Sequence, residues 1–224
     1  EERVILVNLN QNRTCRAAAA VRGATLLLVA ATVAVSTALA EEPDFAKLAA
    51  EKGEALVSVK FVLKMKSGGG DSENEGEVTG LMIDPAGVVL CSNSQIGGNP
   101  AFMRPGSAAT PTDIKIYLGA DDQEGLEARM IARDSELDLC WFKIKSPGDR
   151  KLAAVALDAA ELPTVGERMY TVVRLGKYFD RTPVVRETRV GALVRKPRSL
   201  IVPGTSIGGL GQPLFDGRGR LVGM

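Results

Sequence analysis

Residues 208–224 read GGLGQPLFDGRGRLVGM, and this pattern is the clearest indication of fold in the chain. A glycine-rich turn precedes the apolar residues 213–215, a second turn follows at Asp216-Gly217, and residues 221–223 form another apolar run. Short apolar runs bounded by glycine turns are typical of β-strands. We therefore expect two short strands joined by a tight turn, with a glycine bend ahead of them.

The composition favours an all-β protein that is large enough to bury a core. The chain has 224 residues, of which 24 are glycine and 4% are aromatic. Valine, isoleucine and threonine recur in short runs, as they do in strands. The 28 Lys and Arg nearly balance the 27 Asp and Glu, so the overall charge gives no indication of a nucleic-acid partner.

The absence of histidine restricts the chemistry most strongly. Histidine is the usual general base of nucleophilic hydrolases and the commonest zinc ligand. The three cysteines, Cys15, Cys91 and Cys140, are too few and too scattered for a zinc site or a disulfide framework. We therefore expect no metal and no cofactor.

Charge is distributed unevenly along the chain. Residues 41–163 carry 13 Lys and Arg against 21 Asp and Glu, whereas residues 164–224 carry 11 against 4. Such an imbalance can help two halves dock, can steer an acidic ligand to the basic half, or can simply reflect solvated surfaces. All three interpretations stay open at this point.

Residues 1–40 resemble an export signal. Three arginines precede an apolar segment at 24–35, and Ala38-Leu39-Ala40 fits a small-x-small cleavage site. The alternative is an uncleaved membrane anchor over residues 23–40, although alanine, threonine and serine make this segment weakly hydrophobic. Either interpretation predicts an exported protein, periplasmic or extracellular, that contacts a membrane only if the segment is retained.

The remaining chain divides into a short helix or linker and two β regions. Residues 41–54 form the helix or linker, and alternating apolar residues predict six strands within 55–146 that close a first barrel. The polar, glycine-rich residues 67–75 are expected to form an exposed loop. Residues 147–163 form a crossover, and strand patterns resume over residues 164–224.

Three motifs together resemble the trypsin-like serine proteases, especially the HtrA/Deg family. GGLGQPLFDGRGRLVG resembles the nucleophile loop G-[ND]-S-G-G-P-L and its following strand, with Leu210 at the nucleophile position. GLMIDPAGVVLCSNSQIGG resembles the histidine segment, with Ser94 at the histidine position, and DSELDLCWFKIK resembles the aspartate segment, with Asp138 at the aspartate position. The resemblance implies an all-β double six-stranded barrel whose second barrel, over residues 164–224, is incomplete at Met224.

The resemblance implies that the fold is kept but that two of its three catalytic residues are replaced. Leucine cannot attack a carbonyl, and a serine at position 94 takes up no proton near neutral pH, so Asp138 has no imidazole to orient. Loss of the nucleophile or the histidine alone costs about 10⁶ in turnover in such enzymes. The oxyanion donors would be the backbone N–H groups of Gly208 and Leu210, which need no particular side chain.

Three functions remain open on this basis. The first is a catalytically inactive domain that binds a peptide or protein, or regulates an active relative. The second is a working endopeptidase with a non-standard site, for which Ser206 in PGTSIGG is the candidate nucleophile. The third is a purely structural domain in which Leu210 fills the former cleft. By the same resemblance Cys91 and Cys140 lie on adjoining strands, where they either form a disulfide or serve as small core residues.

Overall fold

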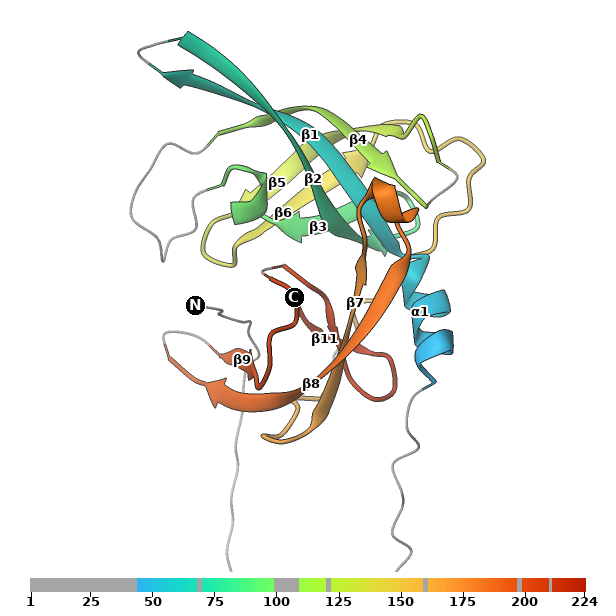
Figure 1. The fold of residues 1–224 in the computed structure, drawn as a ribbon, viewed down its shortest axis with the longest axis vertical. Helices are drawn as coiled ribbons and strands as arrows, with labels where there is room; N and C mark the ends of the chain where they lie inside the picture. Colours follow the sequence, from blue (N-terminus) through green and yellow to red (C-terminus); the bar gives the residue numbers. More distant parts are fainter. Residues whose placement is uncertain are drawn as a thin grey trace, which may run out of the picture. The chain divides into compact units, whose positions relative to one another are not determined.

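The computed structural model describes residues 44–67, 70–98, 109–119, 122–158, 161–196, 199–209 and 211–224. The expected export signal, residues 1–40, lies outside the described residues, and so does Leu210. Within them the fold is all-β, with one α-helix, a closed six-stranded barrel and a second sheet (Figure 1). This confirms the predicted fold class. No helix in the described residues is long and apolar enough to cross a membrane.

The helix α1 (Phe45–Gly53) begins at a clear capping residue. The Asp44 carboxylate accepts hydrogen bonds from the N–H groups of Ala46 and Lys47 at 2.9 and 3.2 Å, which satisfies two donors that a helix start leaves free. Leu48 is buried, and the Phe45 ring lies edge-on to Tyr170 of the second sheet, with 5.6 Å between centroids. The helix therefore packs against the second sheet.

The first barrel closes in the strand order β1-β2-β3-β6-β5-β4. Its strands are β1 (Leu56–Ser67), β2 (Gly70–Asp84), β3 (Val88–Ser92), β4 (Pro111–Tyr117), β5 (Leu126–Asp134) and β6 (Leu139–Ile144). Every neighbouring pair is antiparallel, and closure pairs the first and last strands of the sheet, β1 and β4, with each other. The predicted six-stranded closure is confirmed.

The expected loop at 67–75 is wrong for residues 70–75, which form a strand, although residues 73–75 are exposed as expected; residues 68–69 lie outside the described residues. The strand β2 already begins at Gly70 and pairs with β1 residue by residue, so the two strands form the long hairpin seen in Figure 1. Two cross-strand ion pairs support it: Lys60 with Glu75 at 2.5 Å and Lys64 with Glu73 at 3.1 Å. Opposite charges on facing residues favour strand pairing even where the sequence is polar and glycine-rich.

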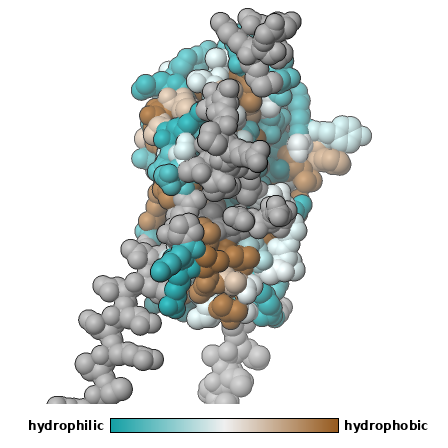
Figure 2. Space-filling view, turned by 90° about the vertical axis from the view of Figure 1, so that its left-hand side faces the viewer, coloured by the Kyte–Doolittle hydropathy of each residue, from teal (hydrophilic) through white to brown (hydrophobic). Residues whose placement is uncertain are grey.

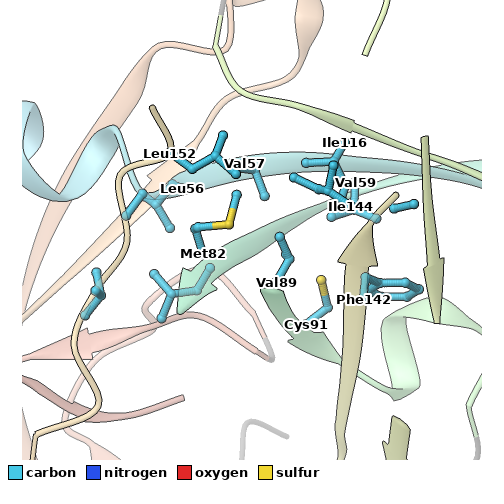
Figure 3. Packing of buried hydrophobic residues seen from close by; sticks show 14 of the residues in the cluster. Leu56, Val57, Val59, Met82, Val89, Cys91, Ile116, Phe142, Ile144 and Leu152 are labelled. Carbon is cyan, nitrogen blue, oxygen red and sulfur yellow. The ribbon is translucent and has the colours of Figure 1, made fainter. Parts of the chain in front are cut away.

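The core of the first barrel is formed by apolar side chains from all six strands. Figure 3 shows Val59, Ile116 and Ile144 meeting from β1, β4 and β6, while Val89 and Cys91 approach from β3. Tyr170, Val172 and Phe215 of the second sheet belong to the same buried cluster. One face of the second sheet therefore packs on the barrel.

The second sheet has five strands among the described residues, in the open order β11-β10-β7-β8-β9. The strands are β7 (Arg168–Arg174), β8 (Pro183–Val194), β9 (Leu200–Pro203), β10 (Leu214–Phe215) and β11 (Leu221–Gly223). A smaller cluster of Met169, Val190, Ile201, Ile207, Leu214 and Val222 packs on the face opposite Tyr170. On the surface that Figure 2 shows, apolar and hydrophilic residues lie in adjacent patches.

Arg174 connects the second sheet to the barrel and to α1. Its Nε donates to the Leu56 carbonyl at 2.6 Å, and its Nη2 donates to the carbonyls of Gly53 at 2.6 Å and Leu118 at 3.3 Å. Its Nη1 donates to the Arg181 carbonyl at 2.9 Å. Burial, and then the charge of Arg181, lower the pKa of the Arg174 guanidinium from its ordinary value.

Candidate functional site

Ser94 and Asp138, 44 residues apart in the chain, are bonded to each other. The Ser94 hydroxyl donates to Asp138 Oδ2 at 2.8 Å, and the Ser94 N–H donates to Asp138 Oδ1 at 2.8 Å. Both carboxylate oxygens are therefore engaged by one residue. The structure brings together two of the three residues that the resemblance singled out, although their correspondence to a triad stays a prediction.

Strand pairing places these two side chains side by side. Ser94 starts the short 3₁₀ helix η1 (Ser94–Ile96) directly after β3, and Asp138 ends the turn that precedes β6. The two strands pair from Val88 opposite Lys143 to Ser92 opposite Leu139, and beyond them the Asn93 N–H donates to the Asp138 carbonyl at 2.9 Å.

Asp138 adopts a left-handed backbone conformation at the end of this turn. Its φ is +56°, a region that aspartate and asparagine enter more readily than most residues. The left-handed backbone and the hydrogen bond from Asn93 together position the carboxylate at the end of the β3–β6 ladder, facing Ser94.

Ser92 is a third member of this cluster that the sequence analysis missed. Its hydroxyl donates to Asp138 Oδ2 at 3.0 Å and lies 3.1 Å from the Ser94 hydroxyl. Ser92 itself is almost completely buried. Because Ser92 ends β3 and Ser94 begins η1, the alternation of a strand does not predict that their hydroxyls meet, and the only sequence signal was the nearness of the two serines.

Asn93 lies between the two serines and is fully buried, with neither amide atom hydrogen-bonded. Its side chain lies against Gly98, where any Cβ would collide with the amide. Buried polar groups without partners are rare and cost about 1–3 kcal/mol. Beside the Ser94–Asp138 contact the site therefore carries a buried amide with no hydrogen-bond partner among the described residues.

The glycine turn that follows Ile207 lies next to this cluster. Gly208, Gly209 and Gly211 have φ values of +101°, +120° and +69°, which side-chain-bearing residues rarely adopt. A Cβ on Gly211 would collide with the Ser92 side chain. The turn thus approaches the Ser92–Ser94–Asp138 cluster closely only because glycine occupies position 211.

Only one of the two predicted oxyanion donors lies within the described residues. Gly208 belongs to the described turn, whereas Leu210, both as the nucleophile-equivalent position and as the second donor, lies outside the described residues. Their role as an oxyanion site stays a prediction.

Cys91 and Cys140 face each other across β3 and β6 as free thiols, and both are fully buried. The Cys140 thiol donates to the Cys91 carbonyl with a sulfur–oxygen distance of 3.6 Å. Burial raises the pKa of Cys140 to about 12 and the pKa of Cys91 well above its ordinary value. Both thiols therefore stay protonated and unreactive at neutral pH, as small core residues do.

The cluster offers hydrogen bonds but no imidazole to act as a general base. Two hydroxyls and one N–H converge on a carboxylate, and the chain has no imidazole to activate a serine. Within the described ranges, no group of three or more His, Cys, Asp or Glu could hold a metal ion that might replace it.

Comparison with known proteins agrees with this geometry. The trypsin-like peptidase domain family matches residues 78–224, a span that includes Ser94, Asp138 and the glycine turn. A search of curated proteins found no match. The family match covers more than half of the chain and contains strands of both sheets. The chain therefore belongs to the trypsin-like peptidase domain family.

Proposed function

We propose that this chain is an exported, catalytically inactive member of its family, of the HtrA/Deg type, that binds peptide or protein segments. The observation that carries the proposal is the Ser94–Asp138 contact. In a working site an imidazole accepts the nucleophile's proton and rests against the aspartate. Here a serine hydroxyl and its own N–H, both at 2.8 Å, occupy the Asp138 carboxylate.

Three further features support inactivity. The chain contains no histidine, and Leu210 stands where the resemblance expects the nucleophile. Ser92 offers a hydroxyl close to Asp138, but this hydroxyl and the two Ser94 donors already occupy the carboxylate, and the chain has no imidazole to take up a proton. A serine without a general base is a poor nucleophile.

Binding is supported by the part of the site that depends on backbone rather than side chains. The turn at Gly208, Gly209 and Gly211 keeps the left-handed conformations that only glycine adopts readily, and Gly211 keeps its close approach to Ser92. Backbone N–H groups in such a turn can donate to a carbonyl or carboxylate oxygen of a bound chain. A domain of this kind can also compete with, or dock on, an active relative.

Inactivity is tested with a fluorophosphonate probe and with labelled casein. The wild-type chain and the variants Ser92→Ala, Ser94→Ala and Ser206→Ala are compared. We expect no labelling and no cleavage by any of them. Labelling that disappears in one serine variant alone would instead establish a working endopeptidase with that residue as nucleophile.

Binding is tested by thermal shift with a panel of short peptides, because a ligand of the folded state raises the unfolding temperature. Stabilisation that saturates with peptide concentration is the expected result. A flat response across the panel would favour a purely structural domain. Export is tested separately by fusing residues 1–40 to a reporter and locating its activity.

A further inference from the structure

We propose that Arg186 forms a carboxylate-binding site on the second sheet, beside the glycine turn, and that this site selects acidic ligands. The inference rests on the proposed peptide-binding function and specifies the chemistry of the ligand. The carboxylate can come from an Asp or Glu side chain or from the C-terminus of the bound peptide.

Arg186 extends from β8 to the glycine turn. A Cβ built on Gly208 would collide with Nη1 of Arg186, so the guanidinium lies directly against this backbone. Next to Gly208, a Cβ on Gly209 would meet no atom within 4 Å. The guanidinium therefore borders open space at the turn where the resemblance expects the oxyanion donors.

Arg186 has no acidic partner among the described residues, whereas three other arginines of residues 164–224 do. Arg168 pairs with Glu187 at 3.6 Å, Arg181 with Glu77 at 3.4 Å, and Arg220 with Asp216 at 2.7 Å. The Arg186 side chain is exposed, so a ligand can reach it. Its charge is available for an external anion.

Thr171 supplies a second group that lacks a partner. It lies directly opposite Arg186 in the β7–β8 ladder, and facing residues of an antiparallel pair project from the same side of the sheet. Thr171 is fully buried, and its hydroxyl makes no hydrogen bond within the part of the chain that the structure describes. Thr171 therefore places an unsatisfied hydroxyl on the same side of the sheet as Arg186.

A carboxylate fits this arrangement better than a neutral group. The planar guanidinium donates two parallel hydrogen bonds to a carboxylate, and such charge-assisted bonds are about twice as strong as neutral ones. The surrounding half of the chain carries 11 Lys and Arg against 4 Asp and Glu over residues 164–224, which favours the approach of an anion. The guanidinium thus binds a carboxylate directly, and the net positive charge of residues 164–224 attracts it from a distance.

The test measures the affinity of four probe peptides for the full chain by isothermal titration calorimetry. Acetyl-Ala-Ala-Val-Glu-amide and acetyl-Ala-Ala-Val-Gln-amide differ only in a side-chain carboxylate. Acetyl-Ala-Ala-Val-Ala with a free C-terminus and its amide differ only in a terminal carboxylate. The pair that shows the larger difference identifies the source of the acid group.

Three variants accompany the wild type. Arg186→Gln removes the proposed cation, and Arg218→Gln removes one equal charge from the exposed β10–β11 turn as a matched control. Thr171→Val removes only the unpartnered hydroxyl. We expect Arg186→Gln to weaken the carboxylate peptide roughly tenfold or more, Thr171→Val to weaken it severalfold, and Arg218→Gln to leave it nearly unchanged.

The outcomes separate the two proposals. If neutral and carboxylate peptides bind the wild type equally, or if Arg186→Gln and Arg218→Gln behave alike, the carboxylate site is refuted while peptide binding stands. If none of the four peptides binds, both proposals fail. Far-UV circular dichroism of each variant establishes that it is folded, and Thr171→Val tests the site without a change in charge.

Discussion

Ser94 donates both its hydroxyl and its backbone N–H to the Asp138 carboxylate, each at 2.8 Å. A carboxylate that would orient an imidazole in a working protease here stabilises a serine at the start of η1. Under the proposed function this contact is structural, and its removal should alter stability rather than turnover.

The variant Asp138→Asn tests whether the hydrogen bonds to Asp138 stabilise the fold. Asparagine suits the left-handed backbone at this position, but its neutral amide replaces an acceptor of three hydrogen bonds. We expect the free energy of unfolding in urea to fall by about 1–3 kcal/mol. Asp180→Asn is the matched control, since Asp180 is also left-handed but exposed, and should change stability by less than about 0.5 kcal/mol. Equal losses in both variants would contradict a structural role for the Asp138 contacts.

Ser94→His would place a ring beside the Asp138 carboxylate. The wild-type chain has no histidine, so this ring would give the sole imidazole resonances in an NMR titration. A neighbouring carboxylate favours the imidazolium, and we expect a pKa above the ordinary value of about 6.5. Adding Asp138→Asn should return the pKa toward that value; an unchanged pKa would show that the ring points away from residue 138.

Gly211→Ala tests the approach of the glycine turn to Ser92. A methyl group there would meet the Ser92 side chain, whereas at Gly219, whose φ of +73° is close to the +69° of Gly211, it would meet the flexible end of Lys52 at 3.1 Å. Both variants carry a similar backbone penalty, so their difference reports the contact. We expect Gly211→Ala to unfold at a lower urea concentration than Gly219→Ala, and the reverse order would refute the close approach.

The buried thiols predict a loss of stability at alkaline pH. The folded-state pKa of Cys140, about 12, lies above its ordinary 9.0, so the protonated thiol stabilises the fold fully below pH 9. This contribution is lost as pH rises from 9 toward 12. Urea unfolding at pH 7, 8.5 and 10 should show a steeper decline for the wild type than for Cys91→Ala/Cys140→Ala.

A thiol reagent provides an independent check of the same burial. In a Cys15→Ser background, Cys91 and Cys140 should react with a disulfide reagent at pH 8 only after unfolding. Fast reaction in the native state would show that the thiols are accessible.

The strand pattern was predictable because alternation and turn residues are local signals. The hairpin around residues 84–87 follows from two apolar runs and the turn residues Asp84-Pro85-Ala86-Gly87 between them, whereas the strand at 139–144 was indicated by the resemblance. Residues 70–75 were missed because their strand depends on ion pairs with β1, which local composition does not reveal. Pairing partners across a sheet override weak local propensity.

The candidate site was predictable only where a motif carried it. Ser94 and Asp138 were found by resemblance, and their contact follows from the pairing of β3 with β6. The unpartnered state of Thr171 and Arg186 depends on which residues face each other across β7 and β8, and no short motif encodes that arrangement. Groups without a partner can be identified only after the hydrogen-bond and ion-pair partners of every polar side chain on both strands are known.

The acceptors around Arg174 are all main-chain carbonyls, from Gly53, Leu56, Leu118 and Arg181. Substitution at any acceptor position leaves its carbonyl in place, so the barrel and the helix can diverge in sequence without losing this junction. The donor has no such freedom, because only a guanidinium offers five N–H groups in one plane. At this junction the requirement for a particular side chain therefore falls on position 174 alone, while the four acceptor positions need only their backbone.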